Sequence, residues 1–97
     1  MIYHVVPGER WQVALQIGFY EAASLATEGF IHASSQGQVE GVLKRYYQNQ
    51  EGLVLLHIDE NKLTAELKYE LAASVNEMFP HIYGRLNTDA VIKTTSL

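Results

Sequence analysis

The chain contains four histidines, and imidazole is the side chain best suited to proton transfer near neutral pH. They are His4, His32, His57 and His81. No two of them stand at the spacing of an HxH or HxxxH motif, so the sequence has no local zinc signature and we expect no metal site. Each lies in or beside a predicted strand, so the rings can still meet on one face of a sheet. The alternative is four separate, hydrogen-bonded, half-buried rings.

The segment EGFIHASSQGQV, residues 28–39, places His32 at the end of a predicted strand and just before a predicted helix. A helix N-terminus carries free N–H groups and the positive end of the helix dipole, and it therefore attracts phosphate. Ser34 and Ser35 would add hydroxyl donors to such a site. The structural alternative is that Ser35 caps its own helix while His32 bonds to neighbouring backbone, and the pattern alone favours this alternative.

A second dense stretch is MFPHIYGRL, residues 78–86. Regular strand alternation would put His81, Tyr83 and Arg85 on one face. That combination suits an anionic ligand with an aromatic ring, because arginine carries a fixed positive charge. Glu70 is the carboxylate best placed for acid–base work or for binding a ribose. The alternative is a sheet edge whose polar face lies in water.

The composition indicates one ordinary globular domain spanning residues 1–97, with 47% hydrophobic and 19% charged residues. The net charge of −4 argues against general nucleic-acid binding, which needs a basic surface, but it permits a small nucleotide-like ligand. The absence of cysteine excludes a disulfide framework and a thiol nucleophile. No apolar run is long enough to cross a bilayer and no signal peptide is evident, so we expect a cytoplasmic protein without a membrane partner.

Two amphipathic helices are predicted to position these residues. The first covers residues 9–17 and has the apolar spacing of Trp11, Ala14, Leu15 and a stop at Gly18. The second begins at a capping box of Ser35 and Gln38 and runs for about three turns. Its apolar stripe is Val39, Val42, Leu43, Tyr46 and Tyr47, the tyrosine pair being assigned to the core. Arg45 and the other polar residues of this helix are expected on the opposite face.

Strands are expected where β-branched and aromatic residues alternate or run together. These segments are residues 2–6, 30–33, 53–58, 66–71, 81–86 and 90–94. The run 53–58 is apolar on both faces apart from His57, which indicates a central strand. Asp59 is placed to cap a short helical turn, Asn87–Thr88 to form a turn, and residues 19–28 to form a connection. The order predicts an α+β domain with two helices packed near a mostly antiparallel sheet.

The motifs together resemble a family of small uncharacterised bacterial proteins, domain-of-unknown-function family 952. The resemblance is carried by YHVVP, SLATEGFIHAS, QVEGV with the following tyrosine pair, LVLLHID and FPHIYGRLNTDAVI, so it spans nearly the whole chain. GFIHAS and FPHIYG are its most specific parts. The family brings no established activity, but it looks like a minimal relative of the ADP-ribosyltransferase superfamily, which includes the tRNA 2′-phosphotransferases.

That relationship implies a split, mostly antiparallel sheet with a pocket for NAD between its halves, and an NAD-dependent glycosyltransferase or phosphotransferase-like activity. By position, His4 matches the residue that contacts a ribose, and His32 matches the residue near the nicotinamide or a phosphate. The third position, often Glu in the superfamily, is offered here by His81 or Glu70. The resemblance thus implies that His32, His81 and Glu70 are catalytic. The residues expected to bind the cofactor are His4, Ser34, Ser35, Tyr83 and Arg85.

Two other functions remain open at the level of sequence. A non-catalytic nucleotide-binding module would keep the pocket and lack the chemistry, and the absence of a clearly placed acid favours it. A structural or protein-interaction domain would have no small-molecule site. That last alternative predicts that the histidines lie far apart.

Overall fold

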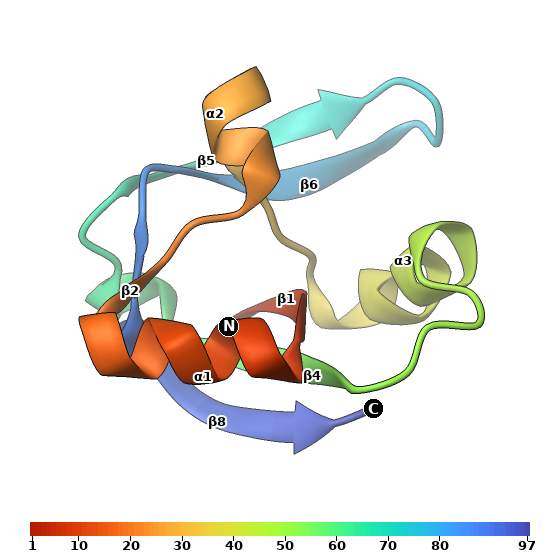
Figure 1. Cartoon of the computed structure of the whole chain (residues 1–97). Helices are drawn as coiled ribbons and strands as arrows, with labels where there is room; N and C mark the ends of the chain where they lie inside the picture. Colours follow the sequence, from red (N-terminus) through yellow and green to blue (C-terminus); the bar gives the residue numbers. More distant parts are fainter.

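Two three-stranded antiparallel sheets, joined through one backbone bridge, form the framework of the molecule. The structure is a computed structural model that describes residues 1–97. The first sheet has the order β1-β4-β8, with β1 at Ile2–Pro7, β4 at Leu53–Ile58 and β8 at Val91–Ser96. The second has the order β3-β6-β5, with β3 at Ile31–His32, β6 at Glu77–Tyr83 and β5 at Glu66–Ala72. An antiparallel bridge between Tyr3 and Ser34 links the two sheets. Figure 1 shows β1, β4 and β8 on one side of the molecule and β5 and β6 on the other.

All strand pairings in the chain are antiparallel, including a third, two-stranded sheet of β2 (Phe19–Tyr20) and β7 (Leu86–Asn87). This confirms the α+β class and the antiparallel arrangement. The central place of β4 is also as predicted. After β4, the Asp59 side chain accepts from Asn61 N–H at 2.9 Å and so starts the predicted short turn, η2 (Glu60–Lys62).

The structure contains three α-helices instead of the two that periodicity predicted. They are α1 (Gly8–Ile17), α2 (Ala23–Glu28) and α3 (Val39–Tyr46). The additional helix α2 lies in the segment expected to be a connection, because six residues are too few to display a helical period. In α1, Trp11 and Ala14 are buried as predicted, but Leu15 is 51% exposed. The stripe of α1 that faces the sheet is therefore narrower than the sequence pattern suggested.

The start of α3 is fixed to the second sheet by a side chain of its own capping box. Ser35 N–H donates to Gln38 Oε1 at 3.0 Å, which confirms the predicted box. The amide of Gln38 then donates to the backbone carbonyl of Met78 in β6 at 2.8 Å. A short 3₁₀ turn, η1 (Gln36–Gln38), precedes α3, so α3 is shorter than the expected three turns.

The predicted strand 81–86 is displaced, since β6 begins and ends earlier. Phe79 and Pro80 are extended as expected, but they lie inside β6. The strand ends before Gly84, where an added Cβ would lie 2.9 Å from Ala65 Cβ, so only glycine fits. The predicted turn at Asn87–Thr88 is replaced by β7 and a 3₁₀ turn, η3 (Thr88–Ala90), which leads into β8.

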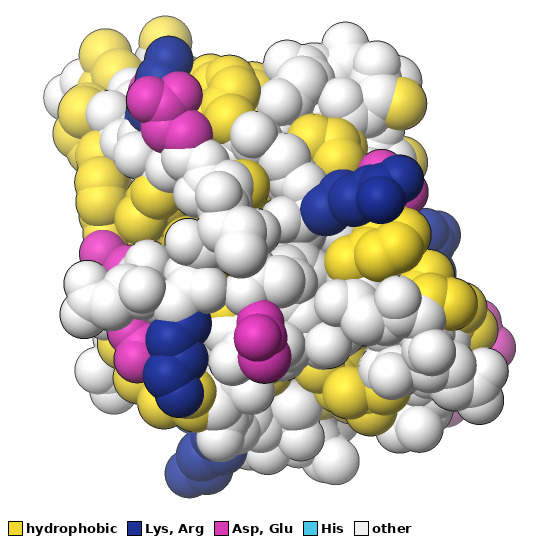
Figure 2. Space-filling model, turned by 90° about the vertical axis from the view of Figure 1, so that its left-hand side faces the viewer, with side chains coloured by type: hydrophobic (Ala, Val, Ile, Leu, Met, Phe, Trp, Pro, Cys, Tyr) yellow, Lys and Arg dark blue, Asp and Glu magenta, His cyan; other side chains and the backbone are white.

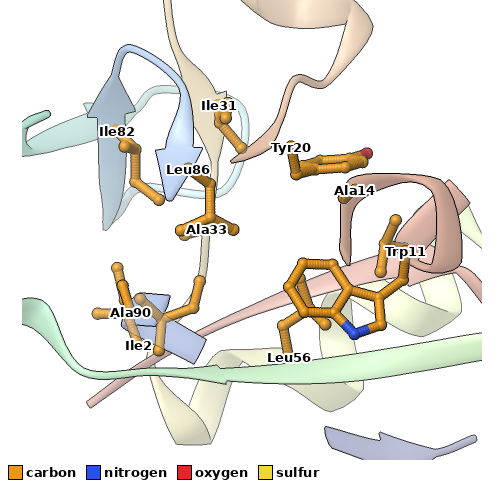
Figure 3. Packing of buried hydrophobic residues seen from close by; sticks show 12 residues of the cluster. Ile2, Trp11, Ala14, Tyr20, Ile31, Ala33, Leu56, Ile82, Leu86 and Ala90 are labelled. Atoms are coloured by element: carbon orange, nitrogen blue, oxygen red, sulfur yellow. The ribbon is translucent and has the colours of Figure 1, made fainter. Parts of the chain in front are cut away.

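The hydrophobic core lies between α1 and the two larger sheets (Figure 3). The first sheet contributes Ile2 and Leu56, the second contributes Ile31 and Ile82, and α1 contributes Trp11. Because these side chains pack in one cluster, buried contacts fix the position of one sheet relative to the other. None of the helices is long and apolar enough to cross a membrane.

Candidate functional site

A pocket of about 630 Å³ lies where the edge of β1, helix α3 and the β3-β6-β5 sheet come together. Its walls are mostly apolar and aromatic, and include Tyr3, Val39, Val42, Tyr46, Tyr47 and Phe79. The polar side chains that line it are His4, His32, His81, Ser34, Glu28 and Arg45. Figure 2 shows the molecule from the side away from α3, and no histidine is visible on that face.

Three of the four histidines meet in this pocket. His4 comes from β1, His32 from β3 and His81 from β6, where His32 and His81 are paired in register. Their rings meet edge to face with centroids 5.2 Å apart. His57 does not line the pocket; its ring packs against Tyr3 with centroids 5.0 Å apart, and its Nε2 is 2.8 Å from Thr95 Oγ1. The structural alternative, in which the histidines lie far apart, does not describe these three.

His4 is a buried ring held in one tautomer. Its Nδ1–H donates to the backbone carbonyl of His32 at 2.6 Å, because a carbonyl oxygen can only accept. Burial lowers the pKa of His4 from 6.5 to about 4, so the ring is neutral at pH 7. Its Nε2 therefore carries a lone pair.

His81 is oriented by a carboxylate. Its Nδ1–H donates to Glu70 Oε1 at 2.8 Å, and its ring stacks on Phe30 with centroids 4.0 Å apart. The hydroxyl of Tyr83 donates to the same Oε1 at 2.5 Å. The hydrogen bonds from Tyr83 and then His81 hold the pKa of Glu70 below its ordinary value, so the carboxylate is ionised at neutral pH. This arrangement presents His81 Nε2 as an acceptor.

His32 is the most exposed of the three rings. Its Nε2 is 2.9 Å from Glu28 Oε2, and the two side chains are 53% and 49% exposed. Glu28 ends α2, and Gly29, with φ +88°, turns the chain into β3, so that His32 returns to face it.

Each of the three rings thus has one nitrogen with a protein partner and one without. All three histidines line the pocket, and each keeps one ring nitrogen without a protein partner. They offer three hydrogen-bonding or proton-accepting positions from three different strands. No group of three or more His, Cys, Asp or Glu side chains is arranged to hold a metal ion.

The structure separates Ser34 from Ser35, the two residues expected to supply hydroxyl donors, and uses the backbone amides of both. Ser34 lines the pocket, but its N–H donates to the carbonyl of Tyr3 at 2.8 Å. The N–H of Ser35 donates to Gln38, and Ser35 does not line the pocket. Both amides are therefore committed to the sheet bridge and the helix cap, so neither is free to bind an anion.

The expected common face of His81, Tyr83 and Arg85 forms only in part. His81 and Tyr83 both bond to Glu70, while neither Tyr83 nor Glu70 lines the pocket itself. Arg85 lies beyond the end of β6, where its Nε donates to Glu21 at 3.2 Å and its guanidinium covers the ring of Phe19. The strand ends at Tyr83, and alternation therefore does not carry Arg85 to the pocket.

Sequence reasoning missed Arg45 and the exposed part of the aromatic wall. Arg45 was expected on the outer face of α3, and Tyr46 in the core, but both line the pocket and Tyr46 is 63% exposed. The spacing of residues along α3 already indicated that Arg45 lies on the side of the helix that faces the pocket. Val39, Val42 and Arg45 recur at every third position, which follows one side of a helix closely enough to place all three on the pocket.

The fold and the site define a small α+β protein with two larger antiparallel sheets and a pocket lined by three histidines. The chain belongs to the family of proteins of unknown function DUF952, which it matches over residues 5–94. This confirms the family resemblance seen in the sequence. No curated protein matches the chain.

Solved structures from one relative have the same fold. The crystal structure of protein CC0527 from Caulobacter crescentus superposes with a TM-score of 0.87 at 29% sequence identity, covering 97% of this chain and 82% of that chain. The solution NMR structure of CC0527 gives a TM-score of 0.84 at 30% identity, covering 99% of this chain and 83% of that chain.

Proposed function

We propose that the pocket binds a nucleotide of the NAD or ADP-ribose class and that the protein is an ADP-ribosyltransferase-like enzyme. The observation that carries this proposal is the set of three imidazoles with free ring nitrogens at one pocket. The volume of about 630 Å³ lies within the range typical of small-molecule sites. Aromatic walls suit a nucleobase or nicotinamide ring, and imidazole nitrogens suit the hydroxyls of a ribose.

His4 is assigned to the binding of a ribose hydroxyl. Its neutral ring keeps a lone pair on Nε2 at pH 7, and that nitrogen accepts a hydrogen bond from the hydroxyl. The hydrogen bond from its Nδ1 to the His32 carbonyl holds the ring in place. A buried, neutral acceptor of this kind orients a ligand without adding charge.

His81 is assigned to proton transfer, with Glu70 as the residue that positions it. Bound NAD would supply an ADP-ribosyl group, with nicotinamide as the leaving group. His81 Nε2 takes the proton that an acceptor hydroxyl loses as its oxygen bonds to the ribose carbon. The ionised Glu70 carboxylate stabilises the imidazolium that results. As an imidazolium, His32 beside His81 donates from Nδ1 to a phosphate or to developing negative charge while its Nε2–H stays bonded to Glu28.

A nucleotide-binding module without catalysis is the second candidate, and one observation favours it. The two carboxylates next to the histidines are both engaged, Glu70 by His81 and Tyr83, and Glu28 by His32. Neither is free to orient a ribose as the acid of a transferase would.

Titration calorimetry with ADP-ribose and NAD, together with an assay for nicotinamide release, tests the proposal. We expect binding by the wild type, and a loss of release by about 10²-fold or more in His81→Gln with affinity little changed. His57→Gln is the matched control, since His57 does not line the pocket. It should leave the affinity and the nicotinamide release unchanged. Binding without release would support the non-catalytic module. Absence of binding at millimolar ligand by folded protein would contradict both candidates.

A further inference from the structure

Arg45 is the one Lys or Arg side chain that lines the pocket. It lies near the end of α3, and its guanidinium takes part in no ion pair. Three other basic side chains have an acidic partner: Lys44 pairs with Glu40, Lys68 with Glu66, and Arg85 with Glu21. A guanidinium is charged at every physiological pH and presents several N–H donors in one plane. The pocket therefore contains a fixed, uncommitted positive charge.

The residue one turn earlier on α3 explains why this charge stays free. Lys44 has Glu40 four residues before it, at 3.2 Å, whereas Arg45 has Gly41 at the same spacing. An added Cβ at Gly41 would lie 3.0 Å from Arg45 Nη1, so the guanidinium rests in the space that a side chain would occupy. Glycine inside a helix costs about 1 kcal/mol relative to alanine. Gly41 thus weakens α3 and leaves space for the guanidinium of Arg45.

The backbone amides beside the pocket and the second expected arginine are already used. The amides of Ser34 and Ser35 donate to Tyr3 and Gln38, and Arg85 is paired with Glu21 away from the pocket. The ring of Tyr46 lies 5.7 Å from the Arg45 guanidinium carbon and flanks the same wall. Among the pocket residues, the fixed positive charge therefore comes from Arg45 alone.

We propose that Arg45 binds a phosphate of the ligand and thereby selects phosphorylated nucleotides over nucleosides. This inference rests on the proposed function, because it places the ribose at the histidines and the phosphate at α3. Paired N–H groups of a guanidinium match two phosphate oxygens, and such charge-assisted bonds are about twice as strong as neutral ones. Gly41 is a positioning residue in this arrangement, since it acts through Arg45.

The first test compares Arg45→Gln with Lys44→Gln by calorimetry on the full chain. Both variants remove one positive charge from neighbouring positions of α3, but Lys44 does not line the pocket. We expect Arg45→Gln to weaken ADP-ribose binding by about tenfold or more, and adenosine binding by less than about twofold. Lys44→Gln should leave both affinities unchanged. Equal ADP-ribose affinity in the wild type and Arg45→Gln would overturn the assignment.

The second test separates binding from structure. In Gly41→Ala the new methyl group displaces the guanidinium, while alanine strengthens the helix. We expect the melting temperature to stay the same or rise while ADP-ribose affinity falls. A purely structural role for Gly41 predicts that both change in the same direction, and that result would overturn the positioning role.

Inorganic pyrophosphate distinguishes failure of this inference from failure of the proposed function. If the wild type binds neither ADP-ribose nor adenosine, the nucleotide proposal fails. The selection of nucleotides by Arg45 fails with it, but the phosphate-binding role of Arg45 stands if pyrophosphate binds the wild type measurably more tightly than Arg45→Gln, and falls if the two are alike.

Discussion

The Nδ1–H of His4 donates to the backbone carbonyl of His32 across 2.6 Å, and this bond joins two pocket histidines from different sheets. The two segments otherwise meet through the single bridge of Tyr3 and Ser34. Because the carbonyl can only accept, the bond fixes the His4 tautomer and leaves Nε2 as an acceptor without a protein partner. This contact therefore adds to the shared core in joining the two sheets, and it also sets the chemistry of His4 at the site.

The first prediction concerns the pH dependence of stability caused by His4. Its pKa is about 4 in the folded chain and 6.5 when unfolded, so between these values the unfolded state binds more protons. The free energy of unfolding should therefore fall as the pH drops from above 6.5 to about 4, by about 3 kcal/mol from this residue. Urea unfolding measured from pH 7.5 to pH 4 provides the check.

His4→Asn is the control for this prediction, since its amide can still donate to the His32 carbonyl but does not titrate. The His4 contribution is the difference between the two pH profiles, and it should be confined to the range between pH 4 and pH 6.5. A His4 ring that titrates near pH 6.5 by NMR in the folded protein would contradict the account.

The second prediction concerns Glu70 and Tyr83. The hydrogen bond to Glu70, then burial and the negative charge of Glu70, raise the pKa of Tyr83. Glu70→Gln removes the charge, so the pKa of Tyr83 should fall towards its ordinary value of 10.0. NMR of the tyrosine Cζ carbons across pH 8–12 measures this directly. Glu66→Gln, on the same strand, is the control, and a Tyr83 shift of equal size in both variants would argue against the specific bond.

Several parts of the fold follow from short-range signals that need no tertiary information. The apolar run of β4, the capping box at Ser35 and the Asp59 cap all act through neighbouring residues, and the structure has each of them. Helix α2 gave no such signal, because six residues bury too little of one face to show a period. Its place is set by the Gly29 turn and by the β3 strand that follows.

The site was less predictable, because it depends on strand pairing. His32 meets His81 through the register of β3 with β6, and His4 meets His32 through one bridge between sheets. Neither register is encoded in local spacing. The bridge also engages the Ser34 amide, and Arg45, which was expected on the opposite face of the helix, lines the pocket. The sequence cannot reveal such contacts, because a segment that is distant in sequence decides which group a local side chain or amide meets.

The third prediction concerns the turn that brings Glu28 and His32 together. Gly29 ends α2 with φ +88°, a conformation that costs a residue with a Cβ roughly 1–2 kcal/mol. Gly29→Ala should therefore lower the free energy of unfolding by about that amount, as measured by urea denaturation. Gly37 also has open space around its Cα but no positive φ, so Gly37→Ala should change stability by less than about 0.5 kcal/mol. Similar losses in both variants would show that backbone conformation is not the cause.

The fourth prediction separates the core face of β6 from its pocket face. Ile82 is fully buried opposite Ile31, and it neighbours His81 on the other face of the strand. Truncation in Ile82→Ala leaves a cavity in the shared core, so we expect a loss of about 2–5 kcal/mol in the free energy of unfolding. Ile92 in β8 is 49% exposed, so Ile92→Ala should cost much less, about 1 kcal/mol at most. Urea denaturation of both variants measures the contrast, and equal losses would mean that the two sheets do not share one core.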